Sequence, residues 1–372
     1  MRNNAISRMA PSLEPSLRRP LFETAFRGGL GVGLYLAFPA FSDVYRLWER
    51  SAGNPRFAAS AFEYPPISAL YFWPMTFLPS SRWAVLINGV IMVAAAVAIT
   101  WVLARWATGG AGGPVDLRMW IASPALMLLL AVNWDVLVGL IAVLGVVALY
   151  ARREAISGWW LGLGTAFKVF PGIIVLPALP LLEGWRRRIM FLLAGGAVLG
   201  LSYALYAWLK PDEWLFHLEF ASQRTDFDLT VWDLLDRASR PFGANVSPGL
   251  VNSMSTAVLV VAVALTAVWA HLTKPSFARV ATVALIALLV LNKVFKPQYV
   301  LWVLPFLSWV SATGWKVRTL EAVVLLQFAA IYFPLPQAIL PLSTIFGITV
   351  FCLLAYEVIR APSKHLAGPS AV

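Results

Sequence analysis

Long apolar runs follow one another through almost the whole sequence, and they constrain the fold more than any other feature. A membrane-spanning helix needs about 20 mostly apolar residues, and these runs are continuous rather than alternating as in a barrel strand. Hydrophobic residues make up 60% of the 372-residue chain and charged residues 13%, about half the charged share of a soluble domain. The sequence therefore predicts an all-α polytopic membrane protein, with residues 1–372 forming a single domain.

Charges, prolines and glycines divide this apolar sequence into separate segments. The segments lie at residues 22–41, 64–79, 83–104, 118–132, 136–150, 156–168, 170–182, 189–209, 249–271, 278–291, 298–312, 319–333 and 338–359. Several are too short to span a bilayer alone. We expect roughly 11 to 13 membrane helices, including re-entrant or short helix pairs.

Basic clusters indicate the orientation, because Lys and Arg favour the cytoplasmic side. They occur at the N-terminus, at 152–153, at 186–188, at 274–279, at 316–318 and at 360–364. Both termini are then cytoplasmic. Segment 42–63 becomes the first extracytoplasmic loop, and 210–248 an extracytoplasmic, lid-like segment with helices of its own. The net charge of +11 is explained by basic loops beside anionic lipid headgroups, so we expect no nucleic-acid partner.

A charge and a proline interrupt the apolar stretch "GLGTAFKVFPGIIVLPALPLL" at Lys168 and Pro171. Cytoplasmic clusters flank this stretch, so we expect a helical hairpin over 154–185 with Lys168 near its apex. A lysine at mid-membrane costs about 2.5–3.5 kcal/mol. Either Lys168 snorkels to the interface, or it meets an anionic partner at bilayer depth, for which a lipid phosphate is suitable.

A second basic turn, "NKVFKPQY", places Lys293 and Lys296 beside the helix-breaking Pro297. Together with Lys168 it suggests a pocket for a phosphate headgroup. Arg224, in segment 210–248, is suited to clamp a phosphate through two hydrogen bonds.

The polar residues around Arg224 have two interpretations each. Asp226 and Asp228 either bind sugar hydroxyls or a cation, or are solvated loop charges. His217 is either a substrate contact or a surface histidine. We expect no cofactor, and the dependence on a divalent metal stays open.

Asp43 directly follows the first apolar run, in "FSDVYRLWER". A carboxylate at the membrane edge can accept a proton from a hydroxyl nucleophile; alternatively, Ser42 or Asp43 caps a short interfacial helix. Asp135, in "VNWDVLVGL", either caps the next helix or forms a second carboxylate facing Asp43. The aromatic residues around Tyr64 form an interfacial belt or a stacking surface for sugar rings.

The order of these motifs resembles the GT-C superfamily of membrane glycosyltransferases. The resemblance rests on the early Asp43, on "YPP" at Tyr64, on "NWDVLVGLIAVLGVVALY", on the Lys168 stretch and on "NKVFKPQYVLWVLPFL". Within the superfamily the chain is similar to the polyprenol-phosphate-mannose-dependent mannosyltransferases. These include the bacterial phosphoinositol-mannoside enzymes and the first mannosyltransferase of GPI-anchor synthesis. One departure is Lys296, where relatives often carry a small residue before the PQY.

This resemblance implies a GT-C fold and an inverting transfer of a sugar, mannose above all, from a polyprenyl-phosphate donor to a hydroxyl of a glycolipid or glycan. It makes Asp43 the catalytic base, and we expect Gln298 and Tyr299 of the PQY to contact substrate. The enzyme would lie in a bacterial plasma membrane with an extracytoplasmic site. Alternatives are a GT-C enzyme using another polyprenyl-phosphate sugar (arabinofuranose or glucose), a transporter or flippase for a lipid-linked substrate, and a non-catalytic subunit.

Overall fold

The computed structural model describes residues 15–51, 62–108, 115–224, 227, 229–243, 246–333, 335–336 and 338–361. Within these ranges every regular element is a helix, which confirms the prediction of an all-α membrane protein. The longer helices are α1 (Pro15–Ala37), α4 (Ser81–Thr108), α7 (Asp135–Tyr150), α8 (Glu154–Phe167), α10 (Trp185–Leu209), α13 (Pro248–Thr273), α14 (Phe277–Leu291), α16 (Gly314–Tyr332) and α17 (Ile339–Arg360).

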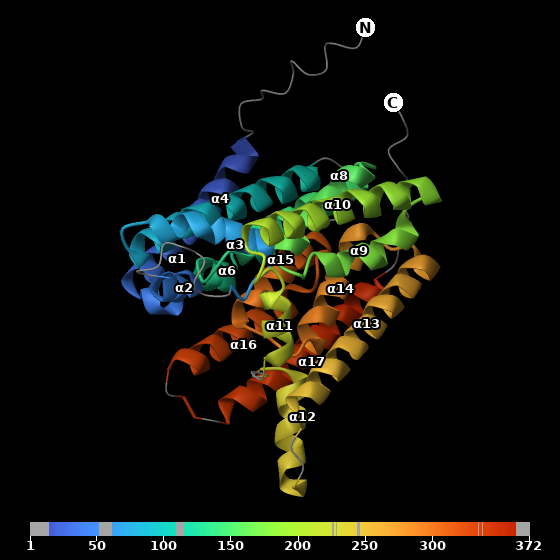
Figure 1. Cartoon of the computed structure of the whole chain (residues 1–372). Helices are drawn as coiled ribbons and strands as arrows, with labels where there is room; N and C mark the ends of the chain where they lie inside the picture. Colours follow the sequence, from blue (N-terminus) through green and yellow to red (C-terminus); the bar gives the residue numbers. More distant parts are fainter. Residues whose placement is uncertain are drawn as a thin grey trace.

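Short helices fill the connections between the long ones. They are α2 (Asp43–Ser51), α3 (Pro66–Phe72), α5 (Leu117–Ile121), α6 (Pro124–Leu129), α9 (Gly172–Ala178), α11 (Phe216–Gln223), α12 (Val231–Ser239), α15 (Val300–Trp309) and the 3₁₀ turns η1 (Pro39–Phe41), η2 (Trp73–Phe77), η3 (Leu179–Leu181), η4 (Arg240–Phe242) and η5 (Pro297–Tyr299). Figure 1 shows α4, α8 and α10 running along one side of the molecule, with α12 projecting at the other.

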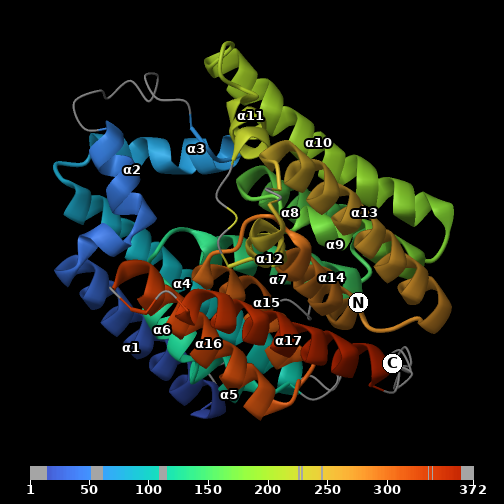
Figure 2. The ribbon, with the colours of Figure 1, turned by 90° about the horizontal axis from the view of Figure 1, so that it is seen from below.

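Four of the described helices, α4, α10, α13 and α17, are long and apolar enough to cross a membrane. In α10 and α13 only 17% and 22% of the most apolar window is buried against protein. Such exposed apolar faces are suited to lipid. By contrast, the interior helices α14 and α15 are mostly buried, and Figure 2 shows them with α7 between α1 on one side and α10 and α13 on the other.

The expected short helix pairs are present where proline breaks an apolar run. Run 118–132 divides into α5 and α6, and Ser123 caps α6 by accepting a hydrogen bond from the Leu126 N–H. In the 154–185 stretch, α8 ends at Phe167 and α9 begins after Pro171, so Lys168 lies in the turn of a helical hairpin. Segment 210–248 carries α11 and α12.

Glycines on α8 allow this hairpin to pack closely on α10. A side chain at Gly158 or Gly162 would collide with the backbone carbonyls of Phe191 and Gly195 on α10. The two helices therefore touch main chain to main chain, as small residues permit between helices in membranes.

Candidate functional site

Lys168 and Asp135 form an ion pair in the protein interior. Lys168 follows the end of α8 in extended conformation, and its N–H donates to the Gly164 carbonyl. Asp135 is the first residue of α7. Nζ of Lys168 donates to Oδ1 of Asp135, and the two side chains are only 7% and 2% exposed. Asp135 therefore does not cap α7; its carboxylate neutralises the buried ammonium.

Four aromatic rings surround the Lys168 ammonium. Its Nζ lies 5.4–5.9 Å from the ring centroids of Tyr64, Trp134, Tyr299 and Trp302, within range for cation–π attraction. The rings of Tyr299 and Trp302 stack with centroids 3.9 Å apart.

The same rings join two turns that lie far apart in the sequence. Phe170, beside Lys168 in the hairpin turn, stacks on Trp302 at 4.3 Å. Trp302 follows the PQY turn at the start of α15. The two basic, proline-broken turns therefore meet in the fold.

Asp43 begins α2, but its carboxylate does not cap the helix. Oδ1 accepts a hydrogen bond from Arg46 at 3.0 Å, and Oδ2 accepts from Asn133 Nδ2 at 3.3 Å and from Gln298 Nε2 at 3.5 Å. The Ser42 hydroxyl donates instead to the carbonyls of Ala131 and Val132. The Asp43 side chain is 22% exposed, so a substrate hydroxyl can reach it.

Asn133 connects the two carboxylates, and sequence reasoning did not single it out. Its Nδ2 donates to Asp43, while its Oδ1 accepts from the Asp135 N–H at 2.9 Å. Asp135 thus neighbours Asp43 through one amide rather than facing it across an open cleft. An Asn two residues before an Asp at a helix start was the available signal, because this spacing is typical of a side chain that binds its own backbone two residues on.

Glu63 adds a third carboxylate beside these groups, also unpredicted. It lies before α3, within electrostatic reach of Arg50, Arg224 and Asp43. Burial raises the pKa of the Glu63 carboxyl above its ordinary value, and the three nearby arginines Arg50, Arg224 and Arg46 oppose that rise. A carboxyl with a perturbed pKa beside other titratable groups marks a candidate site.

Lys293 and Arg224 form a cationic region near Tyr299. Burial, and then the neighbouring Arg224, lower the pKa of Lys293; its Nζ donates to the Ala221 carbonyl and to Asn252 Oδ1. Arg224 lies 5.9 Å from the Phe220 ring centroid. Tyr299 is within electrostatic reach of Asp135, Arg224, Asp43 and Glu63, so it is near both the carboxylates and Arg224.

The remaining candidates are less closely associated with this cluster. Lys296 is half-buried and precedes η5. His217 is buried on α11, with its Nε2 2.6 Å from the Tyr203 hydroxyl, and burial lowers its pKa. Asp226 and Asp228 lie outside the described residues. Within the described ranges no three His, Cys, Asp or Glu side chains group as metal ligands.

A buried ion pair, a reachable carboxylate and cations inside a helical bundle define an integral membrane protein with an intramembrane polar site, a combination that indicates function. The family model of glycosyltransferase family 87 matches residues 62–292. This is more than half of the chain, which therefore belongs to this family of GT-C-like membrane glycosyltransferases. A search of curated proteins found no match.

The matched range divides the candidate residues. Tyr64, Asp135, Lys168, His217 and Arg224 lie inside it. Asp43 precedes the matched range, and Lys293, Lys296, Gln298 and Tyr299 follow it. The family match thus supports glycosyl transfer as the activity, while the role of each residue rests on its surroundings.

Proposed function

We propose that this glycosyltransferase moves a mannosyl group from a polyprenyl-phosphate donor to a hydroxyl of a glycolipid or glycan acceptor. The transfer occurs on the extracytoplasmic side of a bacterial plasma membrane. The observation that carries the proposal is the Asp43 carboxylate: it is reachable from outside and is held by hydrogen bonds from three side chains. A positioned carboxylate of this kind is what a general base requires.

In the proposed reaction the acceptor oxygen attacks the anomeric carbon on the face opposite the phosphate. The new oxygen–carbon bond forms as the carbon–oxygen bond to phosphate breaks, and the acceptor proton passes to Asp43. A single displacement inverts the anomeric configuration. The polyprenyl phosphate leaves with the bonding electron pair and needs no proton.

The cations beside Tyr299 support the leaving-group part of the proposal. The Lys293 ammonium donates two hydrogen bonds, to Ala221 and Asn252. Because an ammonium has three N–H donors, one N–H remains for a phosphate oxygen. Arg224 lies close enough to lower the pKa of Lys293 and would share the phosphate. Lys296 would add a further positive charge, whereas Lys168 is already paired with Asp135. Fixed cations at a developing charge contribute a few kcal/mol each.

Asp43→Asn tests the base assignment. We would measure transfer of radiolabelled mannose from polyprenyl-phosphate mannose to lipid extract in proteoliposomes. Asp236→Asn is the control, since Asp236 on α12 is paired with Arg240. General base catalysis contributes about 10²–10⁴-fold to the rate, so the transfer rate of Asp43→Asn should fall by that factor, and the rate of the control should not fall. Full activity of Asp43→Asn excludes this base.

Donors that carry arabinofuranose or glucose on the same polyprenyl phosphate test which sugar the enzyme transfers. Mannose transfer should dominate, and the product should carry the inverted anomer. Preferred transfer of another sugar would replace mannose while leaving the Asp43 mechanism intact. Movement of the labelled lipid across the bilayer without transfer would indicate a transporter instead.

A further inference from the structure

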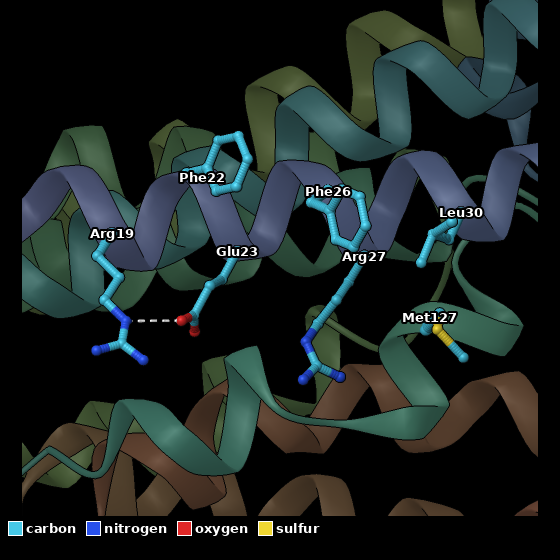
Figure 3. A pocket seen from close by; sticks show the side chains of 7 residues that line it. All are labelled: Arg19, Phe22, Glu23, Phe26, Arg27, Leu30 and Met127. Carbon is cyan, nitrogen blue, oxygen red and sulfur yellow. Dashed lines mark hydrogen bonds and ion pairs between the residues drawn. The ribbon is translucent and has the colours of Figure 1, made fainter.

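A groove with a volume of about 530 Å³ runs along α1, and no residue of the Lys168 cluster lines it. Figure 3 shows its residues: Arg19, Glu23 and Arg27 point to one side, and the apolar residues of α1 lie beside them. Met127 of α6 closes one end. The volume is in the range of small-molecule sites.

The charges of this groove are unequal. Arg19 pairs with Glu23, with Nε and Oε1 2.8 Å apart. Arg27 lies one helical turn beyond Glu23, and within the part of the chain that the structure describes no hydrogen bond or ion pair engages it. The groove therefore presents one uncompensated positive charge.

The position of Arg27 along α1 indicates which kind of partner this charge needs. It lies eight residues beyond Arg19, which is about 12 Å along the helix axis, among the exposed apolar side chains of α1. An arginine among exposed apolar side chains of a membrane protein is stabilised by an anionic partner. No side chain of the described residues pairs with Arg27, so its guanidinium can accept an anion from outside this part of the chain.

Apolar side chains next to Arg27 supply the rest of the surface. Phe22, Phe26 and Leu30 are each more than half exposed, and the two phenylalanine rings stack with centroids 6.2 Å apart. A side chain at Gly31 would collide with the Met127 carbonyl. Glycine there lets α6 approach α1 and form the closed end of the groove.

We infer that this groove binds one anionic phospholipid. The phosphate accepts hydrogen bonds from the Arg27 guanidinium, a geometry that arginine forms readily, and one acyl chain lies along Phe22, Phe26 and Leu30. The net positive charge favours an anionic over a zwitterionic headgroup. Basic pockets between membrane helices are known to hold such headgroups. The inference is independent of the sugar-transfer reaction.

Native mass spectrometry of the purified full chain tests this site, with phosphatidylglycerol and phosphatidylcholine as probes. Arg27→Gln removes the charge, and Met127→Trp fills the groove while keeping every charge. Arg82→Gln, at an exposed arginine on α4, is the matched control. Retention of phosphatidylglycerol should fall about fivefold in Arg27→Gln and also fall in Met127→Trp, while the control stays unchanged.

Three results would overturn the inference. Equal losses in Arg27→Gln and Arg82→Gln would mean general attraction between charges. Equal retention of both phospholipids by the parent protein would remove the headgroup preference. Displacement of phosphatidylglycerol by an equimolar amount of polyprenyl phosphate would identify the groove as a donor site.

Discussion

Lys168→Met is the substitution whose effect the structure predicts most directly. It removes the ammonium and leaves the Asp135 carboxylate buried, 2% exposed and without its counter-ion. Asp135 Oδ2 accepts no hydrogen bond within 3.5 Å in the described part of the chain, and the neutral Trp302 indole nearby does not replace the lost ammonium. The variant should therefore be much less stable than the parent.

The size of the loss follows from what Lys168 contacts. Removing one partner of a buried ion pair costs about 3–5 kcal/mol. The four ring contacts add about 0.5–2 kcal/mol each when desolvated, of which methionine recovers a part because sulfur also packs well on aromatic rings. We expect a loss of at least about 3 kcal/mol in the free energy of unfolding.

A double-mutant cycle with Asp135→Asn separates the ion pair from packing. The free energy of unfolding would be measured by SDS titration in mixed micelles, followed through tryptophan fluorescence. The double variant buries no charge, so it should regain most of the stability that Lys168→Met loses. Arg240→Gln, which breaks an exposed pair, should change little.

If the free-energy changes of the two single substitutions add up to that of the double variant, the reasoning is refuted, because Lys168 and Asp135 then do not stabilise each other. Donor affinity of the double variant answers a separate question. If Lys168 also binds phosphate, the double variant regains stability but not affinity for polyprenyl phosphate.

Two further predictions concern pH. Glu63 has a raised pKa, so the folded state holds its proton more tightly than the unfolded chain, and stability should fall as the pH rises above about 4.5. In Glu63→Gln the melting temperature should fall less over the same pH range. Identical melting profiles of the two proteins would contradict this. Lys293 has a lowered pKa, so its ammonium loses its proton, and polyprenyl-phosphate affinity declines, as the pH rises toward values still below the ordinary lysine pKa of 10.5. Lys293→Arg should keep its affinity to higher pH, and parallel titration curves of the two proteins would exclude that role.

The helices were predictable because charge and proline end them locally. The expected run 83–104 became α4, whereas run 118–132, expected as one segment, is divided at Ser123 and Pro124. The hairpin turn at Lys168 followed from flanking basic clusters and Pro171. These signals act within a few residues, so they can be read without knowing which helices touch.

Partners within the site were not predictable in this way. Lys168 was expected to need an anion, but Asp135 lies 33 positions earlier, and only the packing of α7 against α8 brings it within reach. Asn133 gave a local signal for its bond to Asp135, yet nothing local indicates that its amide nitrogen meets Asp43, 90 positions away. Ring contacts around Lys168 likewise require two distant turns to meet.

The glycine contact between α8 and α10 ties the interior to the surrounding lipid. With main chains touching at Gly158 and Gly162, neither helix can tilt without carrying the other. Membrane helices adjust their tilt to hydrocarbon thickness, and most of the apolar window of α10 is not buried against protein. A thinner or thicker bilayer would thus shift the backbone just before Lys168, making the ion pair and its ring enclosure sensitive to acyl-chain length.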